Sequence, residues 1–338
     1  MKLDKKTYLA RIILIVVCFC IAVLCYVRMN QSYDELARYP YVNDDNRDIL
    51  LKYLDSDDIN YMINQQIRPE QFMDFIELDG FEMRNALLYS AAKKAQNSDN
   101  QSIINFVNRY RSHFSLKTLP DLLKYYSYID LITFYETEWV LNENLKLVSD
   151  LSDPFVILNS TQTIYKYKPE VVSFQNIFIQ QACLEDLKAM CEDYKKVLGK
   201  ELTFERGYED YETILNQYNG FKEQYPDYAD LYMSTAGQNE MQLGYSIIIS
   251  GLSQWLIPYL DSLNSSEETA VEFVNLETLE WLMDNSYRYG FVMRFKEDKE
   301  EQSGKAYNPY VFRYVGKKNA KKMFKSNLCM EEMEFSSL

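Results

Sequence analysis

The stretch Asn-Glu-Met-Gln-Leu-Gly-Tyr-Ser-Ile-Ile-Ile at residues 239–249 decides how the C-terminal half of the chain is expected to fold. It ends in three consecutive isoleucines, and β-branched residues of this kind favour a strand. Other runs with strand character lie on both sides of it, separated by long excursions with helical spacing, an order that indicates an α+β domain. We expect one mainly antiparallel sheet of strands at 202–208, 243–249, 290–295 and 310–315, with flanking helices at 176–198, 279–287 and 319–324.

The region before this domain has a different pattern. Between residues 44 and 140 apolar side chains recur at three- and four-residue spacing, which is typical of short amphipathic helices that share a core. Ser, Asp and Pro residues then cluster between 149 and 154, and such a cluster indicates a loop. We therefore place a boundary near residue 150 and expect an all-helical region, 29–149, followed by the α+β domain, 150–338.

The N-terminal segment 8–28 is apolar apart from Arg11 and Arg28. About 20 such residues form ~30 Å of helix, enough to cross the hydrocarbon core of a bilayer. No small-residue cleavage site follows, so we expect an uncleaved transmembrane anchor rather than a signal peptide. Basic residues precede the segment and acidic residues follow it. This bias predicts a single-pass protein of the cell membrane, with a cytoplasmic tail at 1–7 and an extracellular body.

Composition and charge exclude several classes of function. The formal charge is −14, and because the first eleven residues carry four basic side chains and one acidic one, the remainder carries −17. A body this acidic does not bind nucleic acid by neutralising phosphates, and it should be repelled by anionic lipids and anionic wall polymers. The chain has one histidine, His113, for which a surface or half-buried position is expected, and no Cys-x-x-Cys pair.

Five short sequence words follow one another in the C-terminal half. They are Tyr-Lys-Pro-Glu-Val-Val at 167–172, Gly-Tyr-Glu-Asp-Tyr-Glu at 207–212, Asn-Glu-Met-Gln-Leu-Gly-Tyr-Ser-Ile-Ile at 239–248, Tyr-Gly-Phe-Val-Met-Arg-Phe at 289–295 and Asn-Pro-Tyr-Val-Phe-Arg-Tyr-Val-Gly at 308–316. In this order they resemble the VanY-type D-alanyl-D-alanine carboxypeptidases, which are bacterial zinc peptidases that trim the terminal D-alanine from peptidoglycan stem peptides. The resemblance spans about 155–335.

The departures from the family fall on its chemistry. The resemblance implies that a His and an Asp of the third word and a His of the fifth bind zinc, but these positions hold Met241, Ile248 and Val311. Two hydrocarbon chains and a thioether do not provide the nitrogen and oxygen ligands of a zinc site. Asn308 replaces the family's catalytic Glu and cannot accept a proton. Glu209 replaces its substrate-binding Arg and should repel a substrate carboxylate.

Residues that shape the family's fold are kept, so we interpret the domain as a scaffold retained after the reaction was abandoned. These residues are Gly207, Tyr208, Gly244, Gly290, Arg294, Pro309, Arg313, Tyr314 and Gly316. We therefore predict no catalytic residue, no metal ligand and no zinc cofactor at these positions. Met241, Ile248, Asn308 and Val311 should converge in apolar surroundings as a hydrophobic plug, with Glu209 at a water-accessible rim.

These features predict a membrane-anchored, extracytoplasmic pseudoenzyme with a binding or scaffolding role at the bacterial cell wall. Its partner would be a cell-wall peptide or another protein. Two alternatives stay open. The chain could be a hydrolase that acts on cell-wall peptides through a non-standard site of carboxylates and a hard cation, although no clustered ligand pattern stands out. It could also be an interaction protein that works through its helical region.

Overall fold

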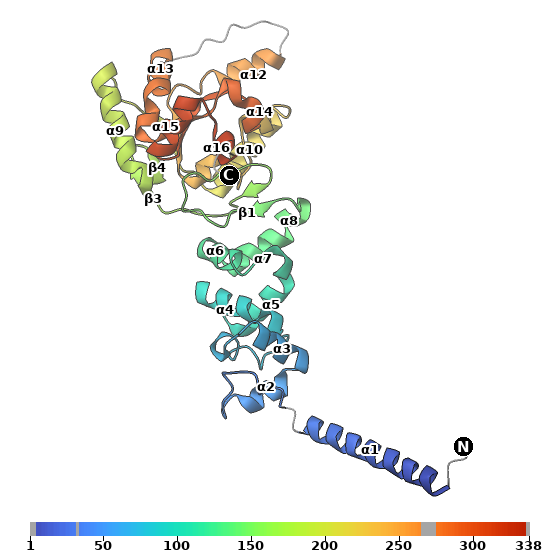
Figure 1. Cartoon of the computed structure of the whole chain (residues 1–338). Coiled ribbons are helices and arrows are strands. Elements are labelled where there is room, and N and C mark those ends of the chain that lie inside the picture. The colour runs from blue at the N-terminus through green and yellow to red at the C-terminus, as the bar shows by residue number, and fades with distance from the viewer. Residues whose placement is uncertain (1–4, 32–33, 265–274, 336–338) are drawn as a thin grey trace. The chain divides into compact units, whose positions relative to one another are not determined.

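A computed structural model of the chain describes residues 5–31, 34–264 and 275–335. The chain forms two compact units, Met1–Leu116 and Lys117–Leu338 (Figure 1). The division between the units falls at Leu116, so the helices just before residue 150 belong to the C-terminal unit. The limits of the family domain, 150–338, stay a proposal.

Helix α1 (Lys5–Gln31) occupies the apolar N-terminal segment. Its central part, Tyr8–Met29, is 22 residues long with a mean hydropathy of 2.8, and no part of its apolar window is buried. It is the one helix among the described residues that is long and apolar enough to cross a membrane. This is consistent with a single-pass anchor, and the orientation of the anchor stays a prediction.

The rest of the N-terminal unit is helical, as its apolar spacing predicts. Asp55 and Asp99 accept hydrogen bonds from the backbone at the starts of α3 and α5, which fixes where these helices begin. Ile59 and Met62 of α3 share one core with residues such as Leu36, Leu50 and Met83. The elements are α2 (Arg47–Tyr53), α3 (Ser56–Asn64), η1 (Pro69–Gln71), η2 (Met83–Asn85), α4 (Ala86–Ala95), α5 (Asn100–Tyr110) and η3 (Arg111–His113).

The C-terminal unit begins with three helices and two small sheets. Strands β1 (Lys146–Leu147) and β2 (Gln162–Thr163) pair in parallel, and β3 (Val171–Phe174) and β4 (Ile177–Gln180) form an antiparallel hairpin. The helix expected over 176–198 therefore begins later than predicted, with α9 (Gln181–Leu198). At the start of the segment that was predicted as helix, Ile177 and Ile179 are buried and Phe178 between them is exposed. This alternation is the period of a strand. The preceding helices are α6 (Thr118–Tyr125), α7 (Tyr128–Glu136) and α8 (Glu138–Leu141).

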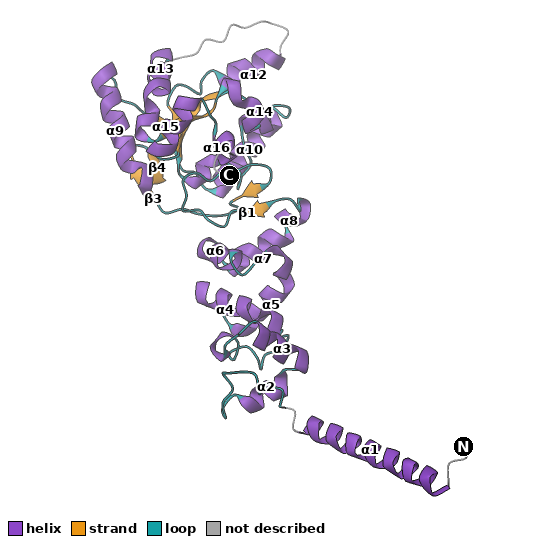
Figure 2. Ribbon diagram, viewed as in Figure 1, coloured by secondary structure: helices purple, strands orange, loops and turns teal. Residues whose placement is uncertain are grey.

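The main sheet contains the four strands that the sequence predicts. Its order is β5-β6-β8-β7, and every neighbouring pair is antiparallel. Figure 2 shows these strands in orange with helices packed around them. The two central strands are buried along their whole length, so they form the core on which the surrounding helices pack. The strands are β5 (Phe204–Arg206), β6 (Ser246–Ile249), β7 (Phe291–Phe295) and β8 (Asn308–Tyr314).

The remaining elements connect and cover this sheet, which confirms the α+β class of the domain. They are α10 (Tyr211–Gln224), α11 (Ala229–Tyr232), η4 (Glu240–Leu243), α12 (Leu256–Asn264), α13 (Leu276–Asn285), η5 (Ser286–Tyr289), η6 (Glu297–Lys299), α14 (Glu300–Ser303), α15 (Lys317–Ser326) and α16 (Met330–Phe335). Helix α9 reaches the sheet through a hydrogen bond of 2.9 Å from the hydroxyl of Tyr314 to Asp186.

Candidate functional site

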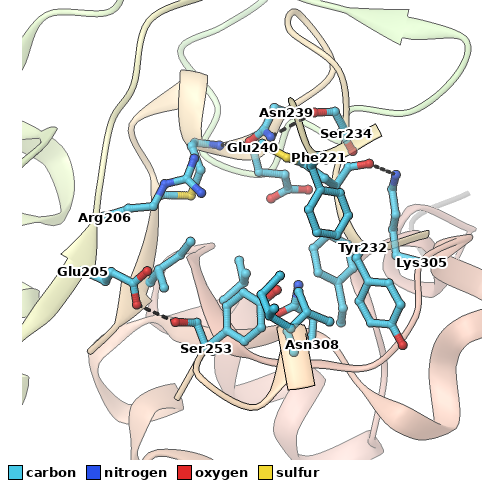
Figure 3. A pocket seen from close by; sticks show the side chains of 18 residues that line it. Glu205, Arg206, Phe221, Tyr232, Ser234, Asn239, Glu240, Ser253, Lys305 and Asn308 are labelled. Atoms are coloured by element: carbon cyan, nitrogen blue, oxygen red, sulfur yellow. Dashed lines mark hydrogen bonds between the residues drawn. The ribbon is translucent and has the colours of Figure 1, made fainter. Parts of the chain in front are cut away.

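A cavity of about 290 Å³ lies beside the central strands of the main sheet. Met241, Ile248, Asn308 and Val311 all line it, so residues from two separate sequence words meet at one place. Figure 3 shows the cavity with the side chains that surround it. The other lining residues come from β5, from the stretch that runs from α10 through α12, from β7 and β8, and from the loop after α14.

The antiparallel sheet brings these four residues together. Ile248 on β6 and Val311 on β8 are direct partners across the two strands. Asn308 begins β8, and Met241 lies in η4, one short turn before β6. Gly244 makes that turn with a φ of 73°, where a Cβ atom would lie 3.1 Å from the side chain of Gln180. The convergence therefore follows from strand register and from one glycine turn.

The residues at these positions do not fit a zinc ion. Met241, Ile248 and Val311 are 4, 5 and 7% exposed and present only hydrocarbon and thioether groups to the cavity. Zinc requires nitrogen, oxygen or thiolate ligands. No group of three or more His, Cys, Asp or Glu side chains that could hold a metal ion occurs among the described residues. We therefore assign no reaction step to a metal here.

Asn308 is the polar member of this set. It is 2% exposed, and within the described part of the chain its Oδ1 atom has no hydrogen-bond partner. A buried carbonyl oxygen without a donor is costly, so a ligand that donates a hydrogen bond would be favoured in the cavity. As a neutral amide, Asn308 can accept such a bond but cannot act as a general base.

The surroundings of the cavity are not apolar throughout, contrary to the expectation. Glu205, Arg206, Glu240 and Lys305 also line it, and the three apolar side chains leave it open rather than plugging it. Each of these charged groups has a polar partner. The Nζ atom of Lys305, for example, donates to the carbonyl oxygens of Asp230 and Met233, at 2.6 and 3.2 Å. Burial lowers the pKa of Lys305.

Glu240 is the centre of a buried network of charges. Its Oε1 atom accepts a hydrogen bond of 2.6 Å from Arg294 Nε, and its Oε2 atom accepts one of 2.9 Å from Arg313 Nη1. Arg294 also pairs with Glu331 at 2.6 Å, and Arg313 donates to the carbonyl oxygen of Pro154 at 2.7 Å. Burial on its own would raise the pKa of Glu240, but the two arginines outweigh it and hold the pKa below its ordinary value.

Sequence reasoning kept both arginines as fold-shaping residues but missed Glu240 as their partner. The sequence offered one indication of this role for Glu240. It is the only charged residue of the word at 239–248, and it directly precedes Met241.

Glu209 is half-buried and is not among the residues that line the cavity, so its predicted position at a water-accessible rim stays a prediction. It is paired with Arg206, whose Nε donates to Glu209 Oε1 at 2.8 Å and whose Nη2 donates to both Glu209 and Gln217. The side chains of Arg206 and Glu209 are 26 and 16% exposed. Because the two charges cancel, Glu209 is not the uncompensated negative charge that was expected to repel an anionic chain end.

Gly207 allows the close packing of this segment. A Cβ atom there would lie 2.5 Å from the carbonyl oxygen of Phe178, which instead accepts a hydrogen bond of 2.7 Å from the Tyr208 backbone. No larger residue can occupy position 207 without moving the β4 strand.

Comparison with known proteins identifies the relatives of this unit. Residues 176–317 match the family model described as VanY, D-alanyl-D-alanine carboxypeptidase. The D-alanyl-D-alanine carboxypeptidase of Enterococcus faecalis is 33% identical over 103 residues, which is 30% of this chain and 32% of that protein. The enzyme of the same description from Enterococcus faecium is 31% identical over 102 residues, 30% of each protein. The chain thus spans about a third of the length of these curated relatives.

Two solved structures are also similar. VanYB in complex with D-alanine-D-alanine is 24% identical, with a TM-score of 0.45, and the match covers 55% of this chain and 99% of that one. A mutant of the D,D-pentapeptidase VanY in complex with Zn(II) is 25% identical, with a TM-score of 0.43, and the match covers 54% of this chain and 98% of that one. The sequence and family matches make the C-terminal unit carboxypeptidase-like. Residues 176–317 are thus similar to the VanY-type D-alanyl-D-alanine carboxypeptidases.

Proposed function

We propose that this domain is a catalytically inactive member of its family that binds cell-wall stem peptides in the cavity beside β6 and β8. One observation carries the proposal. The four positions at which the family resemblance implies metal ligands and a general base converge on this cavity, and they carry Met, Ile, Val and Asn. These side chains support packing and hydrogen bonding, but they do not support activation of a water molecule.

The open cavity supports a binding role. It combines an apolar floor with the unpartnered Oδ1 of Asn308 and with N–H donors of Arg206, whose charge is balanced by Glu209. Arg206 uses Nε and Nη2 for its partners, and among the described residues no hydrogen bond involves its Nη1 atom. A short peptide end with methyl side chains, amide N–H groups and a carboxylate matches these features in chemistry. The N-terminal helix would hold the domain at the outer face of the membrane, where such peptides are found.

Binding can be tested with a peptide ending in D-Ala-D-Ala and full-length protein in a non-ionic detergent. Ile257 lines the cavity and is 43% exposed, so Ile257→Trp can fill the cavity from the solvent side without disturbing the core. We expect this change to weaken binding about tenfold or more, which corresponds to ~1.4 kcal/mol. Isothermal titration calorimetry measures the affinity.

Leu263→Trp is the matched control. Leu263 lies on the same helix, α12, is 45% exposed and does not line the cavity. Its substitution should leave the affinity unchanged. No binding by the native protein, or equal binding by all three proteins, would refute the assignment of the peptide to this cavity.

A further inference from the structure

Charge is distributed unevenly near the C-terminal end of the chain. Between Glu301 and Glu331 the sequence contains no acidic residue and seven basic ones, although the whole chain carries a formal charge of −14. Five of the seven are the lysines of α15, and no acidic residue lies in that helix. We call these residues the lysine face: Lys317, Lys318, Lys321, Lys322 and Lys325.

All five side chains of the lysine face are exposed. Along the helix they form two neighbouring rows, because residues four positions apart lie on the same side and are separated by about 6 Å. Lys317 pairs with Asp186 at 2.6 Å. Within the part of the chain that the structure describes, Lys318, Lys321 and Lys325 have no ion-pair partner. Most of this positive charge is therefore not neutralised by the fold.

The fold does not need these lysines. Helix α15 is held by its opposite side, where Ala320 and Met323 are buried in a cluster with Val292, Val315 and Met330. Like charges at three- and four-residue spacing destabilise a helix. Two of the lysines also lie in the first turn, where the helix dipole favours anions and repels cations. An anionic ligand along this face would relieve both effects.

We propose that the lysine face binds a linear polymer of phosphodiesters in the cell envelope, laid along α15. The face runs from Lys317 to Lys325, roughly 12 Å along the helix axis, which suits an extended chain better than a single small anion. Lysines are flexible point charges that can follow a mobile polyanion, and no α15 residue lines the peptide cavity. The lysine face and the peptide cavity are therefore separate sites. That the polymer belongs to the cell envelope follows from the proposed function, in which the body of the protein lies outside the membrane.

Two other occupants fit less well. Protein interfaces are depleted in lysine and enriched in aromatic residues and arginine. The one large apolar side chain exposed on α15 is Phe324, which stacks on Tyr287 with ring centroids 3.9 Å apart. Insertion into a lipid surface requires a helix with an exposed apolar face. The apolar face of α15 is instead buried in the core.

The net charge of the chain predicts repulsion of anionic polymers, and the proposal departs from that prediction for the lysine face. Charges more than about 8–10 Å away are largely screened at physiological salt, so the local lysines dominate.

The test uses full-length protein in a non-ionic detergent and poly(glycerol phosphate) as the probe, with binding measured from about 50 to about 200 mM salt. We expect the native affinity to fall steeply with salt, and monomeric glycerol phosphate not to bind. The combined variant Lys318→Gln, Lys321→Gln and Lys325→Gln should bind about tenfold or more weakly at low salt. Its slope of log affinity against log salt should be smaller by about 2, the value for three lost phosphate contacts.

The matched control changes three lysines of α9 to glutamine: Lys188, Lys195 and Lys196. Each is exposed and already paired, with Glu185, Glu201 and Asp193 respectively, and the net charge changes by the same amount. This variant should bind as the native protein does. Circular dichroism checks that both variants keep their helices.

Several results would overturn the proposal. The native protein could fail to bind the polymer, or bind it with an affinity that does not change with salt, and the control variant could lose as much affinity as the α15 variant. Binding to phosphatidylglycerol vesicles but not to the polymer would indicate a lipid surface instead. Self-association of the native protein in sedimentation, abolished only in the α15 variant, would indicate a second copy of the chain as the partner.

Discussion

Glu240→Gln is expected to lower the free energy of unfolding of the C-terminal unit by about 3–5 kcal/mol, the usual cost of removing one partner of a buried ion pair. Arg294 and Arg313 are 2 and 0% exposed, and both depend on the carboxylate of Glu240. A glutamine keeps the shape, but its amide group has one acceptor oxygen and places N–H donors against a guanidinium. The two arginines would then remain buried without their shared counter-charge.

Urea unfolding followed by tryptophan fluorescence measures this effect. All three tryptophans, Trp139, Trp255 and Trp281, belong to the C-terminal unit, so the signal reports on that unit alone. Glu201→Gln serves as the control, because Glu201 and its partner Lys195 are 61 and 60% exposed and such pairs contribute little. A loss for Glu240→Gln no larger than that of the control would contradict the role of the network.

The same variant predicts a pH dependence. The pKa of Glu240 is lower in the folded protein than its ordinary value of about 4.3. A depressed pKa gives stability that is present above the unfolded pKa and is lost as the pH falls through the folded pKa. The difference in stability between the native protein and Glu240→Gln should therefore be constant from neutral pH down to about 5 and should shrink at lower pH.

The second large effect concerns metal binding. A protein with Met241→His, Ile248→Asp, Asn308→Glu and Val311→His is expected to retain about one equivalent of zinc after dialysis, because two histidines and a carboxylate form a three-ligand set. The expectation rests on the convergence of these positions on one cavity and on the direct pairing of Ile248 with Val311. Mass spectrometry of the metal content measures the result.

The control for this variant omits Val311→His, which leaves two ligands and should lose the zinc on dialysis. Glu209 is left unchanged, because Arg206 already neutralises it and Glu209→Arg would place two guanidinium groups together. A folded four-residue variant without zinc would show that the cleft has been remodelled beyond these positions. Circular dichroism distinguishes that result from a failure to fold.

The sequence predicted the parts of the fold that repeat or follow local patterns. Isoleucine runs indicated the central strand β6, and the order of the five words indicated that four distant residues meet at one cavity. The start of α9 was misplaced because Ile177 and Ile179 fit the apolar pattern of a strand as well as that of a helix. Only their pairing with β3 decides between the two.

The charged contacts of the site were beyond sequence reasoning for a different reason. Glu240 meets Arg294 and Arg313 across 54 and 73 residues of chain, and no local spacing announces such a pair. Arg206 and Glu209 are only three residues apart, but Arg206 is the last residue of β5, so helical spacing rules do not apply. Their neutralising contact therefore became visible only in the folded chain.

The most direct test of the account is to incubate the purified full-length protein with a stem peptide ending in D-Ala-D-Ala, with and without added zinc, and to measure the D-alanine released. The cavity carries Met241, Ile248, Asn308 and Val311 where the chemistry would need metal ligands and a base, so we predict no release above background in either case. Release of D-alanine that a chelator abolishes would contradict the proposal that this domain is inactive.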